Sequence, residues 1–164
     1  MEVYYPAIPY RIFFLYIEPI SALLGAFYAA FKPVTYLQLL SSSIAGNSTS
    51  LPTPVTSSLY QLANLYLLFA VNEHLVLSSS TSLHTWRTLL FGLLVADFGH
   101  LATMIPVARE KGFEQVFVKF WEWNAMEWGS VGFVYSGACM RLSFLLLTSG
   151  WWRNRSTDRK RKQD

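Results

Sequence analysis

The chain carries little charge. Of its 164 residues only 14% are charged, whereas 52% are hydrophobic and 16% are aromatic. A soluble domain carries about 25% charged residues. This shortage favours an integral membrane protein, and the length allows a single domain.

Cysteine and the common catalytic motifs are also scarce. The single cysteine, Cys139, excludes a disulfide within the chain and lies in an apolar segment, where we expect it to be a small buried hydrophobe. No cysteine–histidine spacing typical of zinc occurs, nor does a glycine-rich phosphate loop, GxSxG or HExxH. We therefore expect no metal ion and no cofactor, and nothing indicates a nucleic-acid partner.

Long apolar segments dominate what is present. A helix that crosses a bilayer needs about 20 mostly apolar residues. Four segments meet this length, at about 12–31, 59–77, 86–105 and 127–152. The sequence therefore predicts an all-α fold, an integral membrane four-helix bundle formed by residues 1–152.

The segments between and after these spans are polar. We expect loops at 41–58, 78–82 and 106–124, because the first two are rich in serine and the third carries mixed charge. Residues 153–164 are strongly basic and are expected to form a disordered tail.

The distribution of basic residues predicts the orientation. More of them flank the side that holds both termini than the other side, so the positive-inside rule places both termini in the cytosol. Asn47, in the sequon Asn47-Ser48-Thr49, then lies in the first lumenal loop, where it is a candidate for glycosylation. The final "KRKQD" is similar to a retrieval signal of endoplasmic-reticulum membrane proteins, or is an ordinary basic stop-transfer tail.

Each predicted span carries at least one ionisable residue. Glu18 lies in the first span, Glu73 in the second, Asp97 and His100 in the third, and Arg141 in the fourth. A charge at the bilayer centre costs about 2.5–3.5 kcal/mol even on the lenient insertion scale, so such groups face the bundle interior. Counted from the span ends, Asp97 and Arg141 lie at similar depth, with Glu18 and Glu73 nearer the cytosol.

Carboxyl groups around an arginine suit acid–base chemistry. One buried carboxyl can stay protonated and act as an acid, while a second, kept ionised by Arg141, acts as a base. Hydrolysis, isomerisation and cyclisation of an apolar substrate fit such a site. A purely structural Arg141–Asp97 ion pair is the plainer alternative, and Glu73 lies close enough to a span end to reach the interface instead.

Four stretches carry a resemblance to a family of small four-span membrane proteins of fungal secondary-metabolite pathways: "RIFFLYIEPISALLGAFYAAF", "QLANLYLLFAVNEHLVL", "WRTLLFGLLVADFGHL" and "EWGSVGFVYSGACMRLSFLL". The resemblance covers about residues 9–148. Some members resemble the epoxide hydrolases of aurovertin-, citreoviridin- and asteltoxin-type pathways. The resemblance implies that a flavin monooxygenase epoxidises a polyene made by a polyketide synthase. The membrane protein then opens the epoxides, with water or an internal hydroxyl as nucleophile.

On this hypothesis Asp97 and Glu18 form the acid–base pair, Arg141 orients one of them, and Glu73 is a second candidate base. Five further residues are expected to hold or surround the substrate: His100, Tyr135, Asn64, Tyr66 and Trp128. The expected partners are a lipophilic polyene epoxide and the bilayer, in the endoplasmic-reticulum membrane.

Three other functions remain open on the sequence alone. The first is a proton-transfer isomerase or a terpenoid or polyketide cyclase. The second is a non-catalytic membrane scaffold for pathway enzymes, and the third is a carrier that exports the metabolite.

Overall fold

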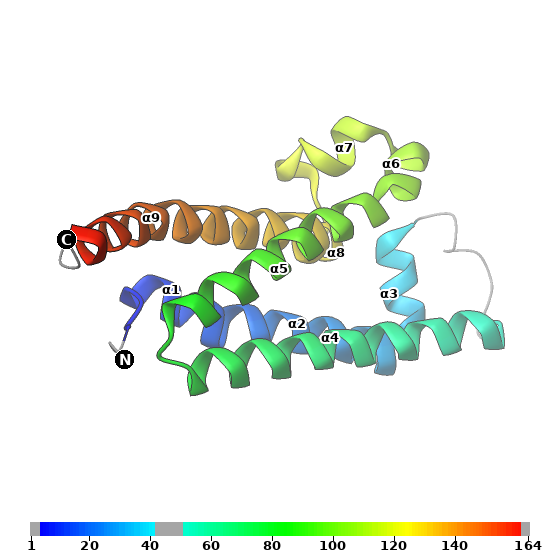
Figure 1. The fold of residues 1–164 in the computed structure, drawn as a ribbon. Helices are drawn as coiled ribbons and strands as arrows, with labels where there is room; N and C mark the ends of the chain where they lie inside the picture. The colour runs from blue at the N-terminus through cyan, green and yellow to red at the C-terminus, as the bar shows by residue number, and fades with distance from the viewer. Residues whose placement is uncertain (1–3, 42–50, 162–164) are drawn as a thin grey trace.

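The structure is a computed structural model that describes residues 4–41 and 51–161, with side chains described up to residue 150. Within these ranges the protein is all-α, as predicted (Figure 1). Asn47, the predicted glycosylation site, lies outside the described residues.

The first long helix runs from Ile8 to Phe31 in three segments. These are α1 (Ile8–Ile12), the π-helical η1 (Phe13–Ile17) and α2 (Glu18–Phe31). Pro19, near the start of α2, has no N–H to donate to the preceding turn. The wider π-helical turn lies directly before it, so the helix adjusts its pitch at the proline and continues.

The next two helices of the described residues are α3 (Pro33–Leu40) and α4 (Thr53–Ser79). Each has a proline in its first two positions, where the missing N–H costs nothing. Pro54 explains why α4 begins six residues before the predicted segment 59–77.

The third long helix, α5 (Leu83–Thr103), starts after Ser82, whose Oγ accepts a hydrogen bond from the Thr85 N–H at 3.4 Å. The predicted loop at 106–124 is mostly helical instead, and this expectation was wrong. It forms three short helices, α6 (Ile105–Lys111), α7 (Phe113–Phe117) and η3 (Phe120–Glu122). The segment buries Ala108 and Val116 completely, and buried backbone must satisfy its own hydrogen bonds.

The last long helix has a short start and a long body: α8 (Ala125–Glu127), the π-helical η4 (Trp128–Gly132) and α9 (Phe133–Arg161). α9 therefore continues into the stretch from residue 153 for which the sequence predicts a disordered tail. Arginine and lysine are good helix formers, which favours this extension over a break.

Among the residues that the structure describes, three helical stretches are long and apolar enough to cross a membrane: Ile8–Phe31, Leu83–Lys111 and Ala125–Gly150. They correspond to the first, third and fourth predicted spans, which makes the chain a candidate integral membrane protein. α4 has the length but is too polar to join them, because its 27 residues include Gln61, Asn64, Asn72 and Glu73.

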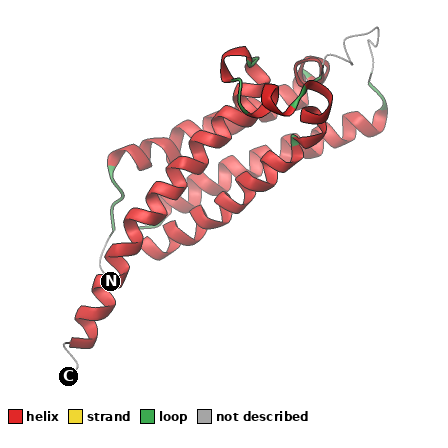
Figure 2. Cartoon of the chain, turned by 90° about the horizontal axis from the view of Figure 1, so that it is seen from above, coloured by secondary structure: helices red, strands yellow, loops and turns green. Residues whose placement is uncertain are grey.

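The long helices form two pairs (Figure 1). α2 packs along α4, and α5 packs along α9, whereas contacts between α4 and α5 are few. Both described ends of the chain lie at the same end of the bundle in Figures 1 and 2. The α2–α4 contact uses small residues: Gly25 faces the Tyr66 ring, and Ala29 is fully buried.

Apolar clusters occupy both ends of the bundle. At the end with the termini, Phe14, Leu77, Leu90 and Phe144 bring all four long helices together. At the other end, one cluster around Ala29 joins α2, α3 and α4, and another around Met104 joins α5, α6, α7 and η4. Between these ends, each long helix contributes a buried charged residue.

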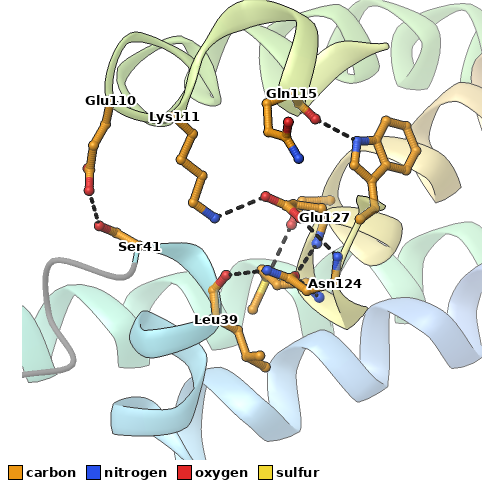
Figure 3. Close-up of polar contacts among 10 residues, drawn as sticks. Leu39, Ser41, Glu110, Lys111, Gln115, Asn124 and Glu127 are labelled. Carbon is orange, nitrogen blue, oxygen red and sulfur yellow. Dashed lines mark hydrogen bonds and ion pairs between the residues drawn. The ribbon is translucent and has the colours of Figure 1, made fainter. Parts of the chain in front are cut away.

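A polar network closes the end opposite the termini (Figure 3). Lys111 Nζ lies 2.9 Å from Glu127 Oε1, and Glu127 Oε2 accepts the N–H of Asn124 at 2.9 Å. Asn124 Nδ2 donates to the Leu39 carbonyl at 2.9 Å, and Ser41 Oγ donates to Glu110 Oε1 at 2.6 Å. Glu127 is buried, and through Lys111 and Asn124 this network connects α3, α6 and α8.

Candidate functional site

The centre of the bundle is organised around Arg141 of α9, whose side chain is fully buried. Its Nη1 donates to Asp97 Oδ2 of α5 at 2.7 Å, and its Nη2 donates to Glu18 Oε1 of α2 at 2.5 Å. Glu73 Oε1 of α4 lies 3.5 Å from the same Nη2. One guanidinium thus connects all four long helices, and it joins the α2–α4 pair to the α5–α9 pair.

The three carboxyl groups around Arg141 differ in how many hydrogen bonds their oxygens accept. Glu18 and Asp97 each have one oxygen hydrogen-bonded to the guanidinium. Both oxygens of Glu73 lack a hydrogen-bond partner within the described residues, as do Glu18 Oε2 and Arg141 Nε, and all these atoms are buried. Buried oxygens without a hydrogen-bond donor, beside a fixed cation, are more typical of reactive sites than of ion pairs that only stabilise a fold.

Exposure also differs among the four groups. Glu73 and Arg141 are fully buried, whereas Glu18 and Asp97 are 7% and 8% exposed. Glu18 and Asp97 are therefore the members that a substrate or a water molecule can reach most directly.

Two neighbours hold the guanidinium in place. The Phe14 ring, one turn before Glu18, lies 5.6 Å from Arg141 Cζ and provides a cation–π contact. Gly137, one turn before Arg141, leaves the space that the side chain occupies. A Cβ at this position would lie 2.6 Å from Nη1 and 3.2 Å from Glu18 Oε1.

The turn that carries Glu18 is tied to the helix that carries Glu73. Pro19 cannot donate to the carbonyl of Leu15, four residues earlier. His74 of α4 contacts that carbonyl through Nδ1 at 2.7 Å. Since a carbonyl only accepts, His74 must be the donor, with its proton on Nδ1. The hydrogen bond satisfies the backbone group freed by Pro19 and aligns α4 beside Glu18.

The predicted substrate residues are more scattered. His100 lies one turn beyond Asp97 on α5, and its ring interacts with the Ser130 backbone, whereas its buried Nε2 has no hydrogen-bond partner within the described residues. Tyr66 packs its ring on Gly25, and its hydroxyl lies 3.5 Å from the Tyr36 hydroxyl. Tyr135 donates its hydroxyl to the Phe117 carbonyl at 3.2 Å, so it faces the closed end of the bundle.

Asn64 and Trp128 lie apart from the Arg141 cluster. Asn64 is on the exposed side of α4, which contradicts its expected place in the site. Trp128 is 50% exposed, and its ring contacts Trp123 edge-on. Helical spacing grouped Asn64 correctly with Gln61 and Asn72, but spacing alone does not tell which face of a helix turns inward.

The sequence reasoning missed Phe14, His74 and Gly137. Each had a signal: Phe14 and Gly137 lie four residues before Glu18 and Arg141, and Pro19 leaves a carbonyl that some donor must satisfy. Within the described residues, no group of histidine, cysteine and acidic side chains has the arrangement of a metal site.

Replacing Gly137 by alanine should destabilise the protein, because the new methyl group displaces the buried guanidinium. The expected cost is about 1–3 kcal/mol, as for other overpacked sites. Thermal unfolding in lipid nanodiscs measures it. Gly99→Ala on α5 is the matched control, because a Cβ there meets nothing within 4 Å. Equal melting temperatures for the two variants would contradict the close packing at Gly137.

Replacing His74 by phenylalanine should cost about 1–3 kcal/mol, because the Leu15 carbonyl loses its donor. In a Pro19→Ala background the backbone N–H of residue 19 can satisfy that carbonyl, so the same change should cost clearly less. Unfolding of the four proteins of this double-mutant cycle gives the coupling. An equal cost of His74→Phe in both backgrounds would show that Pro19 and His74 are independent.

Comparison with known proteins assigns the chain to a family. No curated protein and no solved structure matches it. One family model, described as a domain of unknown function, DUF7704, matches residues 3–150. The match covers α2, α4 and α5 in full, α9 up to residue 150, and all four members of the Arg141 cluster. The chain is therefore a member of the DUF7704 family.

Proposed function

We propose that the protein is a membrane-embedded acid–base enzyme that opens epoxides of a lipophilic polyene without a cofactor. The observation that carries the proposal is the Arg141 cluster, in which three carboxyl groups from three helices surround one buried guanidinium. A single ion pair is enough to hold helices together, so two further carboxyl groups need another explanation.

Charge balance assigns the protons. If all three carboxyl groups were ionised, the cluster would carry two negative charges in excess of Arg141, which is costly inside a bilayer. Glu18 and Glu73 both approach the same nitrogen, Nη2, and carboxyl groups that share a site hold a proton between them. Asp97 is the only one of the three carboxyl groups that accepts a hydrogen bond from Nη1, and we infer that it stays ionised.

The reaction follows from this division. Asp97 takes a proton from the attacking water or hydroxyl group. At the same time the oxygen of that water or hydroxyl group forms a bond to an epoxide carbon. The carbon–oxygen bond of the strained ring breaks, and the departing oxygen receives a proton from the Glu18–Glu73 pair. The proton on Asp97 then returns to that pair. No electrons are gained or lost, and positioning with charge stabilisation supplies the rate.

Two arguments support the proposed substrate class. One is the position of the site between membrane helices, and the other is the resemblance of four stretches of the chain to the fungal epoxide hydrolases. A site between membrane helices admits apolar molecules most readily, and an epoxidised polyene from a polyketide synthase and a flavin monooxygenase has that character. His100, one turn from Asp97, is the predicted substrate residue best placed to bind an oxygen substituent.

We further propose that α4 is a fourth span, so that both termini lie in the cytosol and Asn47 in the lumen of the endoplasmic reticulum. Three observations support this topology. α4 runs beside α2 along the bundle, and both described chain ends lie at one end of it (Figure 1). Its polar residues include Glu73, which faces the Arg141 cluster instead of lipid.

A second candidate function is a non-catalytic scaffold for pathway enzymes. It is favoured by one observation, the way in which Arg141 links the two helix pairs, since such a link serves architecture as well. In that case the network would stabilise the bundle only, and its acidity would be irrelevant to the pathway.

Conversion of an epoxidised polyene by microsomes containing the protein tests the proposal. Asp97→Asn and Glu18→Gln should each lower the rate by at least about 100-fold, the usual contribution of an acid or base. Glu114→Gln, at an exposed position of α7, is the matched control and should keep the rate. Wild-type rates for both cluster variants, folded and at equal amounts, would refute catalysis by these groups and favour the scaffold.

Epitope tags at the two ends of the chain test the topology in sealed microsomes. Both tags should be digested by external protease, because four crossings return the chain to the cytosol. Glycosylation of Asn47, lost in Asn47→Gln, would mark the lumenal loop independently. Protection of one tag alone would mean an odd number of crossings and would remove α4 from the membrane.

A further inference from the structure

The outer side of α4 carries a polar stripe that the proposed chemistry does not use. Positions spaced by three or four residues fall on one face, and all of them are exposed: Ser57, Gln61, Asn64, Leu68, Asn72 and Leu75. We call this stripe the amide seam. Its three amide side chains, Gln61, Asn64 and Asn72, make no hydrogen bond within the described residues.

The depth of these amides makes them costly in lipid. α4 is centred near residue 66, so at 1.5 Å per residue Asn64 lies about 3 Å, Gln61 about 8 Å and Asn72 about 9 Å from its middle. The hydrocarbon core extends about 15 Å to either side of the bilayer centre. Lipid tails offer no hydrogen bond, so a lipid-facing amide there stays unsatisfied unless another protein surface covers it.

We propose that the amide seam is the contact between two copies of this chain. Each amide both donates and accepts, so it can pair with the same residue of a second copy. Two copies inserted in the same orientation hold these residues at identical depths, and all three pairs form at once. A different membrane protein would need matching groups at three depths. Interhelical hydrogen bonds between such side chains are a known means of association in bilayers.

The spacing of the seam also predicts how the two helices cross. The positions repeat after eleven residues, as in Ser57 to Leu68, Gln61 to Asn72 and Asn64 to Leu75. An eleven-residue repeat gives about 3.67 residues per turn and a right-handed crossing. This proposal takes from the proposed function only the placement of α4 across the bilayer and is independent of the chemistry at Arg141.

Cysteine cross-linking of the full-length protein in liposomes tests the proposal. The background is Cys139→Ser, which removes the single native cysteine, because this side chain is exposed and not buried as expected. Leu68→Cys and Leu67→Cys are compared in this background. The two leucines are similarly exposed, at 51% and 46%, but Leu67 points about 100° away from the seam. Mild oxidation at a low protein-to-lipid ratio should give several times more disulfide-linked dimer from Leu68→Cys.

Removing amides should then weaken the contact. Asn64→Leu and Asn72→Leu, added to Leu68→Cys, should each reduce the dimer by about threefold. Equal cross-linking at positions 67 and 68, or cross-linking at 68 that both leucine substitutions leave unchanged, would overturn the proposal. The activity of the Asp97 and Glu18 variants tests the enzyme proposal, whereas cross-linking tests only the contact between two copies. A failure of one proposal is therefore distinguished from a failure of the other.

Discussion

The buried guanidinium of Arg141 constrains the rest of the structure. A charge in the interior of a membrane bundle must be paired, and this one is paired with carboxyl groups on each of the other three long helices. The pairing fixes the depth of each helix relative to the others. It also explains why Gly137 leaves room for the side chain and why Phe14 lies against it.

The same constraint explains the irregular start of the first helix. Pro19 directly follows Glu18, and the cost of its missing N–H is offset by a π-helical turn before it and by the His74 hydrogen bond to the Leu15 carbonyl. Since His74 follows Glu73, that bond positions the Glu73 carboxyl beside Arg141 as well. One of the two π-helical turns of the described residues thus lies beside the point where two carboxyl groups approach one nitrogen, and such turns are frequent at functional sites in helices.

The charged core of the site was predictable from the sequence, and much of its surroundings was not. The high cost of charge in lipid, with the depth of each residue in its span, predicts that Glu18, Glu73, Asp97 and Arg141 line one site. The structure brings all four together. The side of α4 that faces inward was not predictable. It depends on how α4 packs against the small residues of α2, and this packing turns Asn64 outward. The helices at 105–122 were missed because their buried residues are few and their charges suggest a loop.

The central claim is that this network holds a transferable proton beside Arg141. Infrared absorption of the purified protein in lipid detects this proton directly. A protonated carboxyl group has a C=O stretching band at a different frequency from the bands of a carboxylate. The wild-type protein should show this band from a buried group, and Glu73→Gln should remove most of it, because Glu18 alone is then ionised by Arg141. Absence of the band in the wild type, or a band that neither Glu73→Gln nor Glu18→Gln changes, would contradict the claim.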